Sequence, residues 1–545
     1  MSTAQTPQLL SVVTIVFDDA ERLGRAVASV TSQQLPDGWE LEVLVVDDAS
    51  TDGSAQVADA IAAQDPRVRV IHRETNSGGC GAPRNDGTAA ARGRYVAYLD
   101  SDDEYLPGAL ARLVETAERD AADVVTGPAA RFSTRLGERT EPFNESFYAT
   151  VGVFTPFVDR DDVFSDTIAP AKLFRRAFLT EHDLSFPADI AYEDLLFTAR
   201  VWLAAPRLSV VGEPVYLWYI SNDPDNPSIT SSRHKLSNLT DRLESHRRID
   251  RLVRRRADGT RLAELKLEKL ARHDLGLYAR PLPDRDATYQ AAFLEHVGTY
   301  LRNVPNDVRA TLKQPYRLMV RTIVDGDLAS VLAASRFVYR RGQLVVPLAT
   351  VDGGPAWPLV HGKPEHRDYR LTAYCATLAR RGRLHPLSIT VESLSADGGR
   401  LDVRGTTRRV LEEGPLPREL ELVVVDRATS SELGSVPARP RRALFGPKDA
   451  VRWSATLDVA ALLAALPARA ATSGAAGRTL VDVRVRTVGD AAPSAAPDAP
   501  VAGAVAGSQP LVTDLALTTG LDVQAHGRRA DVYATRNGNL ALRVV

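Results

Sequence analysis

The stretch LLSVVTIVF at residues 9–17 is a nearly continuous apolar run, and a helix-like segment at residues 20–32 follows it directly. The same order then repeats, with apolar runs at residues 41–48, 67–73 and 95–99 and helix-like segments at residues 53–63 and 83–91. Apolar strands that alternate with helices are typical of a mostly parallel sheet covered on both faces. We therefore predict an α/β domain whose ligand binds outside the carboxyl ends of the strands.

The pattern changes twice further along the chain. Apolar residues recur at spacings of three and four over about residues 234–340, which predicts helices. Short alternating runs at residues 387–391, 400–404, 420–425 and 480–485 predict an all-β, immunoglobulin-like sandwich region. The predicted domains are an α/β domain at 1–230, a helical linker at 231–345 and a β-sandwich region at 346–545 with an Ala/Pro-rich insertion near 489–509.

The composition excludes several classes of protein. The 67 Lys and Arg residues nearly balance the 69 Asp and Glu residues, and the resulting net charge of −2 argues against nucleic-acid binding. No apolar run approaches the roughly 20 residues that span a bilayer, and the N-terminus lacks the features of a secretory signal. Two cysteines cannot build a disulfide framework or a zinc cluster. We expect a cytoplasmic protein.

Asp100, Asp102 and Asp103 follow the fourth apolar run, in the segment YLDSDD. Residues i and i+2 of an extended chain point to the same side, so Asp100 and Asp102 can face one ligand. Paired carboxylates suit Mg²⁺ or Mn²⁺ bound together with substrate phosphates. Asp and Ser are also common in the turn after a strand, and the pattern favours the two interpretations about equally.

Asp47 and Asp48 end the second apolar run, in the segment VVDDASTDGS. A carboxylate at a strand end could accept a hydrogen bond from a nucleobase N–H. The same residues also suit a strand-to-helix turn with a helix cap, and from the pattern alone we favour the turn.

The segment NSGGCGAPRN at residues 76–85 joins the third apolar run to its helix. It matches neither a Walker A loop nor a G-x-G-x-x-G fingerprint, and its glycines could simply relieve a tight loop. Arg84 stands near a predicted helix start, where the helix dipole favours acids. An arginine there makes more sense if it faces a diphosphate or a nearby carboxylate.

Glu193 and Asp194 open a helical stretch, EDLLFTARVWLAA. Acids in the first turn of a helix stabilise it by a few tenths to about 1 kcal/mol, which explains most such pairs. The alternative is that one carboxylate takes a proton from an acceptor hydroxyl.

Taken together, residues 8–225 resemble the family 2 glycosyltransferases, which are inverting nucleotide-sugar enzymes of the GT-A fold. The resemblance depends on VVTIVFDDAERLGRAVASVTSQ, VVDDASTDGS, the D-S-D-D strand end and the E-D pair. Within that family the chain is most similar to the wall-teichoic-acid polyribitol-phosphate β-N-acetylglucosaminyltransferases, in the segments ETNSGGCGAPRN, IAPAKLFRRAFL and LSFPADIAYEDLLFTARVWLAAPRLSVV.

The resemblance implies how the nucleotide-sugar and its metal are bound. Asp48 would contact the uracil ring, and Asn76 and Arg84 would hold the UDP-sugar. Asp100 and Asp102 would form the metal site, with Asp102 the direct ligand of Mn²⁺ or Mg²⁺.

The resemblance also implies the residues that act on the acceptor. Asp194 would be the general base, and Glu193 beside it would shape the acceptor pocket. Residues 221–235 match a mobile loop that closes over donor and acceptor in relatives.

The implied function is transfer of GlcNAc from UDP-GlcNAc to a hydroxyl of a polyanionic cell-wall polymer, polyribitol-phosphate teichoic acid. The protein would work peripherally at the inner face of the membrane. Some relatives trimerise through two C-terminal β-sandwich modules, whereas about 200 residues follow Gly342 here, enough for one. The oligomeric state, a possible homo-oligomer, is therefore left open by the sequence.

Three other functions are compatible with parts of the pattern. A transferase of the same fold could use UDP-glucose or UDP-galactose on a capsular or lipid-linked glycan, because donor choice depends on a few pocket contacts. Nucleotidyl transfer also uses carboxylates and a metal on an α/β sheet. A non-catalytic polymer-binding protein is the third, and the intact set of acidic residues argues against it.

Overall fold

The structure is a computed structural model, and it divides into two compact units, Met1–Leu270 and Ala271–Val545. It describes residues 7–134, 138–140, 143–220, 232–339, 348–351, 354–358, 367–380, 387–397, 399–409, 419–426, 429, 431–441, 450–465, 479–487, 508–510, 512–513, 521–525, 528–534 and 540–544. The predicted mobile loop (apart from its last four residues) and most of the predicted Ala/Pro-rich insertion lie outside these residues. The three-part domain division stays a prediction.

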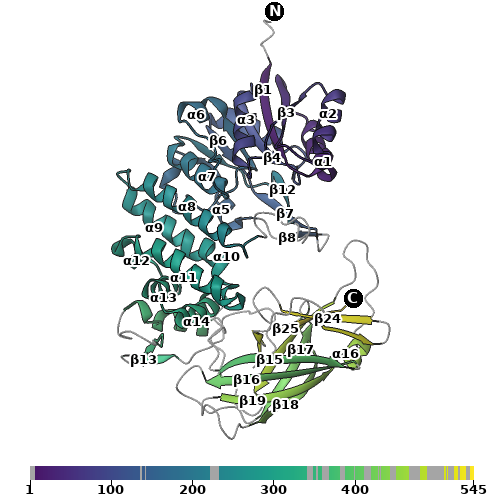
Figure 1. Cartoon of the computed structure of the whole chain (residues 1–545), viewed down its shortest axis with the longest axis vertical. Helices are drawn as coiled ribbons and strands as arrows, with labels where there is room; N and C mark the ends of the chain where they lie inside the picture. The colour runs from purple at the N-terminus through teal and green to yellow at the C-terminus, as the bar shows by residue number, and fades with distance from the viewer. Residues whose placement is uncertain are drawn as a thin grey trace, which may run out of the picture. The chain divides into compact units, whose positions relative to one another are not determined.

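The first unit is built on an eight-stranded sheet in the order β3-β2-β1-β4-β10-β6-β11-β9 (Figure 1). Its strands are β1 (Gln8–Val16), β2 (Trp39–Asp47), β3 (Val68–His72), β4 (Tyr95–Asp100), β6 (Val124–Thr126), β9 (Gly152–Phe154), β10 (Lys172–Arg175) and β11 (Leu208–Val210). The first four pair in parallel, which confirms the predicted α/β sheet, while β10 is antiparallel to both β4 and β6. A second sheet has the order β5-β12-β7-β8, from Glu104–Tyr105, Tyr216–Ile220, Ala129–Ser133 and Glu138–Thr140.

Helices cover both faces of the main sheet, as the continuous apolar strands predicted. The helices of this unit are α1 (Ala20–Thr31), α2 (Ser54–Gln64), α3 (Gly81–Ala90), α4 (Ala109–Asp120), α5 (Glu145–Tyr148), α6 (Arg176–Glu181), α7 (Glu193–Ala204), α8 (Leu236–Val253) and α9 (Gly259–Lys269). Alternate side chains of β1 point to opposite faces of the sheet. Leu10 and Val12 pack in the core that includes α1 and α4, whereas Val13 and Ile15 pack in the core that includes α7.

The strand order places a topological switch point between β1 and β4. The chain leaves β1 toward β2 on one side, and β3 connects through α3 to β4 on the other side. In open α/β sheets, ligands bind in the crevice at the carboxyl ends of the strands at such a point. Asp100 is the last residue of β4 and pairs in register with Ile15 of β1, so the acidic segment after β4 lies at the switch point.

The second unit begins with helices and continues as an all-β region. Its α-helices among the described residues are α10 (Leu275–Ala279), α11 (Ala287–Arg302), α12 (Asn306–Thr311), α13 (Tyr316–Asp325), α14 (Leu328–Tyr339), α15 (Thr372–Arg380) and α16 (Val459–Ala465). The four predicted strands are present within β15 (Leu387–Asp397), β16 (Arg400–Arg409), β17 (Leu420–Asp426) and β20 (Thr479–Thr487). The helical and β regions are therefore as predicted.

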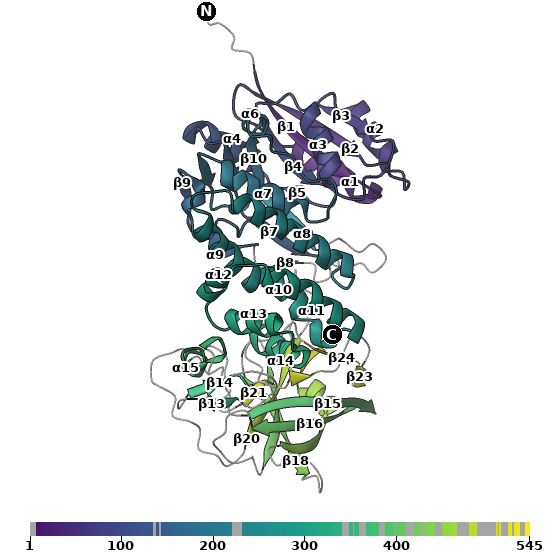
Figure 2. The same ribbon diagram turned by 60° about the vertical axis from the view of Figure 1, so that its left-hand side comes forward.

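Among the described residues, ten strands of the second unit are joined by one path of pairings, β22-β15-β16-β19-β18-β17-β20-β25-β24-β23, and β21 pairs with β20 off this path. Strands β13 (Ala349–Val351) and β14 (Gly354–Ala356) form a separate two-stranded sheet. Figure 2 shows β15 and β16 side by side. The remaining strands are β18 (Glu432–Arg441), β19 (Ala450–Asp458), β21 (Ser508–Pro510), β22 (Val512–Thr513), β23 (Leu521–Ala525), β24 (Arg528–Ala534) and β25 (Leu540–Val544). Strand β18 pairs with β17 and also with β19, which connects the two halves. The immunoglobulin-like sandwich stays a prediction. Among the described residues, no helix has the length and apolar character needed to cross a membrane.

Candidate active site

The acidic residues after β2 are tied to the loop after β3. Asp48 is buried and accepts hydrogen bonds from the Ser77 N–H at 3.1 Å and from the Ser77 hydroxyl at 2.7 Å. Asn76 donates to the Asp48 carbonyl at 3.1 Å, and Arg73 Nη1 lies 2.5 Å from Asp48 Oδ1. The structure thus brings Asp48 and Asn76 together, and donors of the chain itself contact the Asp48 carboxylate. The contacts of these two residues with a nucleotide-sugar stay predictions.

The three acids after β4 differ in their surroundings. Asp100 Oδ1 accepts a hydrogen bond from Arg84 at 2.6 Å, whereas Asp102 Oδ2 lies 3.8 Å from Arg22 Nη1. Partial burial, and then the neighbouring charge of Asp100, raise the pKa of Asp102 to about 6. Asp103 is buried, and its Oδ1 accepts a hydrogen bond from the Tyr219 N–H at 2.8 Å.

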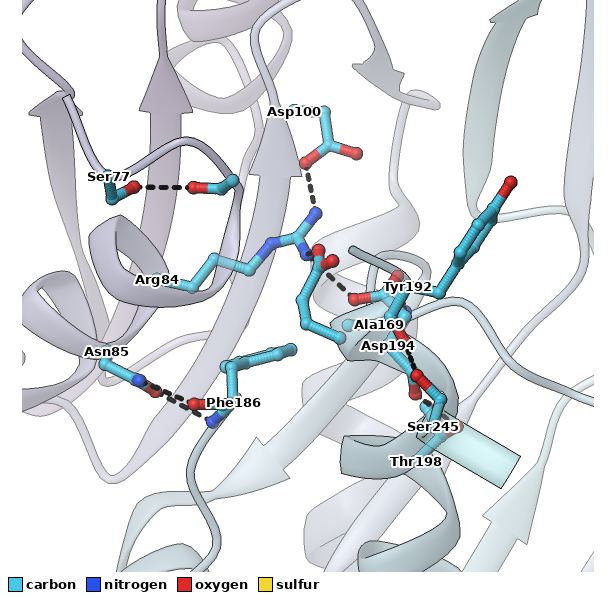
Figure 3. A network of polar contacts seen from close by, with 12 residues as sticks. Ser77, Arg84, Asn85, Asp100, Ala169, Phe186, Tyr192, Asp194, Thr198 and Ser245 are labelled. Atoms are coloured by element: carbon cyan, nitrogen blue, oxygen red, sulfur yellow. Dashed lines mark hydrogen bonds and ion pairs between the residues drawn. The ribbon is translucent and has the colours of Figure 1, made fainter. Parts of the chain in front are cut away.

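Arg84 is the centre of the site (Figure 3). Its Nη1 lies 2.6 Å from Glu193 Oε1 and 2.8 Å from Asp194 Oδ1, while its Nη2 lies 2.6 Å from Asp100 Oδ1. The arginine side chain is only 3% exposed and lies over the Phe186 ring at 5.4 Å. One buried cation therefore joins the strand-end acid of β4 to the acidic pair that opens α7.

Arg84 thus faces nearby carboxylates, one of the two kinds of partner that its position near a helix start indicated. An arginine is unfavourable near a helix N-terminus, and three carboxylates compensate for it here. Its Nε is buried and has no hydrogen-bond partner among the described residues.

Asp194 is held at both carboxylate oxygens. Oδ1 meets Arg84, and Oδ2 accepts the Ala169 N–H at 2.9 Å. Burial raises the pKa of Asp194, against the opposing effects of Arg84 and of the Ala169 N–H. Burial and the charge of Asp194 raise the pKa of Glu193 to about 7. A carboxylate with a raised pKa is a better proton acceptor near neutral pH.

A buried ion pair supports the Ala169 backbone, and sequence reasoning missed it. Lys172 Nζ lies 2.9 Å from Asp166, and both side chains are 0% exposed. The hydroxyls of Thr126 and Tyr148 also donate to Asp166 Oδ2. This network fixes residues 166–172, the segment that presents the Ala169 N–H to Asp194. Its only signal in the sequence was a pair of charged residues beside an apolar strand.

Tyr192 is a second residue that sequence reasoning missed. It precedes α7 with a φ of 64°, which is rare for a residue other than glycine. Its hydroxyl donates to Asn238 Oδ1 at 2.8 Å, and the Arg242 guanidinium lies 3.8 Å from its ring centre. Helix α8 therefore holds the turn from which Glu193 and Asp194 project.

Asp100 and Asp102 fit a divalent cation shared with a diphosphate. Both supply the hard oxygen atoms that Mg²⁺ and Mn²⁺ prefer, and a cation would relieve the repulsion that raises the pKa of Asp102. Within the described residues, no group of three or more His, Cys, Asp or Glu side chains is arranged to hold a metal ion. A diphosphate would therefore have to supply further ligands.

The parallel sheet, its acidic switch point and the carboxylate pair on α7 define a GT-A-like domain. Residues 11–182 match the family model described as Glycosyl transferase family 2. The N-terminal part of this chain is thus similar to the family 2 glycosyltransferases over these residues.

Curated relatives match over about 40% of the chain. A poly(ribitol-phosphate) beta-glucosyltransferase of Bacillus spizizenii is 31% identical over 221 residues, which are 40% of this chain and 33% of that protein. A poly(ribitol-phosphate) beta-N-acetylglucosaminyltransferase TarS of Staphylococcus aureus is 27% identical over 219 residues, 40% of this chain and 36% of that protein. The match thus spans about a third of the length of these relatives.

Solved structures share the fold. The crystal structure of S. aureus TarS residues 1–349 in complex with UDP-GlcNAc is 24% identical, with a TM-score of 0.54, and covers 66% of this chain and 98% of that one. The crystal structure of S. aureus TarS covers 99% of this chain and 85% of that one, at 19% identity and a TM-score of 0.53. At these identities the likeness concerns the fold.

Proposed function

We propose that this chain is an inverting glycosyltransferase that moves GlcNAc from UDP-GlcNAc to a hydroxyl of polyribitol phosphate, with Mn²⁺ or Mg²⁺ as cofactor. The observation that carries the proposal is the Arg84 guanidinium, which joins Asp100 to Glu193 and Asp194 within 2.6–2.8 Å at the switch point of the sheet. The poly(ribitol-phosphate) transferases among the relatives support polyribitol phosphate as the proposed acceptor.

The reaction is a single displacement. The acceptor hydroxyl oxygen forms a bond to C1 of the sugar on the face opposite the leaving group, and the bond from C1 to the UDP oxygen breaks. The hydroxyl proton passes to the Asp194 carboxylate, and UDP leaves with the electron pair of the broken bond. Attack on the opposite face inverts the configuration at C1.

The surrounding side chains orient these groups. Arg84 and the Ala169 N–H fix the two oxygens of Asp194, so that the carboxylate faces the acceptor in one orientation. Asp100 and Asp102 would hold the metal, which when bound stabilises negative charge on the leaving diphosphate. Glu193, beside the base, shapes the acceptor side of the site.

A glucosyl donor is the second candidate, because the relative with 31% identity is a poly(ribitol-phosphate) beta-glucosyltransferase. The two donors differ only at the sugar C2 substituent, and a few pocket contacts decide such a choice. The same proposal would then hold with UDP-glucose in place of UDP-GlcNAc.

The test is UDP release from a panel of UDP-sugars with Mn²⁺ or with EDTA, in the presence and absence of polyribitol phosphate. We expect metal-dependent release from UDP-GlcNAc that increases with the polymer. A higher kcat/KM for UDP-glucose than for UDP-GlcNAc would show that UDP-glucose is the donor. UDP release that polyribitol phosphate does not increase would overturn the proposed acceptor. No release from any UDP-sugar would favour a non-catalytic polymer-binding protein.

A further inference from the structure

Three arginines line a cavity of about 300 Å³ in the helical part of the second unit. Arg309 comes from α12, and Arg317 and Arg321 come from α13, where their four-residue spacing places them on one face. The acidic residue of the lining is Asp368, which lies in the short 3-10 helix Arg367–Tyr369. Val320 contributes an apolar side chain to the wall. The volume lies at the lower end of the range for small-molecule sites.

Two of these arginines are fixed by their own surroundings. Arg321 forms an ion pair with Asp325, with Nη2 at 2.8 Å from Oδ1 and Nε at 3.0 Å from Oδ2. Arg309 donates from Nη1 to the Leu301 carbonyl at 3.0 Å and from Nη2 to Asn306 Oδ1. The oxygens that Arg309 meets in these bonds are neutral, so they orient its charge without balancing it.

The third arginine, Arg317, has an unused donor. Its Nε is buried and lacks a hydrogen-bond partner in the part of the chain that the structure describes. A buried donor without an acceptor is unfavourable. Burial and the neighbouring charge of Arg321 also lower the pKa of Arg309, although Asp368 and Asp325 act in the opposite direction. The buried Nε of Arg317 is the observation that favours an anion in this cavity.

We propose that this cavity binds phosphate groups of a phosphodiester polymer and so forms a second acceptor-binding site on the chain. Guanidinium groups match the geometry of phosphate oxygens. The identity of the polymer as polyribitol phosphate rests on the proposed function. A polymer that repeats one phosphate unit can engage several such sites on one chain, which increases its effective concentration.

The first experiment measures binding of polyribitol phosphate to the full chain by isothermal titration calorimetry. Arg317→Gln should weaken binding by about tenfold or more, because a hydrogen bond to a charged group is lost. The matched control is Arg302→Gln, an exposed arginine at the end of α11 that donates to Thr299 and lies outside the cavity. Equal affinities of the wild-type protein and R317Q would overturn the proposal.

A second variant guards against a folding defect in R317Q. Ala310→Asp keeps all three arginines and adds a carboxylate to the lining, so it should weaken polymer binding as well while thermal unfolding stays cooperative. Inorganic phosphate and UDP serve as alternative ligands. Binding of inorganic phosphate or UDP that depends on Arg317, together with polymer binding that does not depend on Arg317, would show that the site binds a free phosphate compound. The assignment of the polymer would then be wrong.

Kinetics separate this site from the proposed activity. With polyribitol phosphate as acceptor, R317Q should raise KM by about tenfold or more with kcat unchanged, while turnover of a single ribitol-phosphate unit stays at the wild-type level. An unchanged KM for the polymer would overturn the second site and leave the activity intact. Polymer binding that depends on Arg317 in a protein without transferase activity would support the site and overturn the proposed function.

Discussion

Arg84 Nη1 lies 2.8 Å from Asp194 Oδ1, although the two residues are 110 positions apart in the sequence. The same guanidinium contacts Asp100 at 2.6 Å. The residue proposed as the base and the acid proposed to help hold the metal therefore share one buried cation. A substitution that changes the charge of Asp100 or of Asp194 should therefore alter the electrostatic environment of the other residue.

Asp194→Asn tests the proposed base. The amide keeps the shape of the carboxylate but cannot accept the acceptor's proton, so transfer should fall by roughly 10²–10⁴-fold. The affinity for UDP, measured by calorimetry, should change little. The matched control is Asp189→Asn, an acid with 62% of its side chain exposed that pairs with Arg248 at the surface. Near-normal turnover of D194N would rule out this residue as the base.

Arg84→Met tests the bridge itself. Removal of the arginine leaves three carboxylates close together without their shared cation, two of them well buried, which should lower the free energy of unfolding by about 3–5 kcal/mol. Arg119→Met is the comparison, because that arginine is 67% exposed and its pair with Asp120 lies at the surface. Urea unfolding measures both. Similar small effects of the two substitutions would show that the Arg84 bridge contributes little.

The raised pKa of Glu193, about 7, predicts a specific dependence of stability on pH. The unfolded chain releases this proton near the ordinary value of 4.5, whereas the folded protein holds it until about pH 7. Stability should therefore fall as pH rises from about 4.5 to 7, by up to about 3 kcal/mol, and stay level above that range.

Glu193→Gln removes this titration. Relative to the wild-type protein, E193Q should gain stability as the pH is raised from 5 to 7.5, as measured by thermal unfolding across that range. Because Glu193 and Asp194 interact, the wild-type profile reports the pair rather than one residue. Parallel pH profiles of the two proteins would contradict the raised pKa.

The local elements of the N-terminal domain could be predicted from the sequence because they follow from local patterns. The apolar runs place β1 to β4 within one residue or two, and the predicted acidic strand end is Asp100, the last residue of β4. Both features depend on residues that are close in sequence.

The contacts that assemble the site could not be predicted in this way. Arg84 is joined to Glu193 across 109 positions, and a pattern of residue types contains no information on that approach. The Asp166–Lys172 pair is completely buried, yet in the sequence these residues look like ordinary surface charges. The contacts of Asp48 with Arg73 and Ser77 likewise join segments more than 20 positions apart, which the pattern around Asp48 does not show.

Metal removal tests the roles of Asp100 and Asp102. EDTA should abolish transfer, and Mn²⁺ should restore it. Asp102→Asn should raise the Mn²⁺ concentration for half-maximal activity by at least about tenfold, whereas Glu21→Gln, an exposed acid on α1, should not change it. Because the pKa of Asp102 is about 6, protons compete with the metal below that pH, and the Mn²⁺ requirement of the wild-type protein should rise there. If Asp102→Asn leaves the Mn²⁺ concentration for half-maximal activity unchanged, other residues bind the metal.

Gly87 and Gly24 form a matched pair that tests how closely α3 packs on the sheet. A Cβ at Gly87 would lie 2.3 Å from Val13 Cγ1, so Gly87→Ala should destabilise the domain by about 1–3 kcal/mol through overpacking. Gly24 lies within α1 and has nothing within 4 Å of an added Cβ. Gly24→Ala should therefore stabilise by about 0.5–1 kcal/mol, because alanine favours the helix. Urea unfolding of both variants checks the opposite signs, and a neutral effect of G87A would mean that α3 can move away from β1 at little cost.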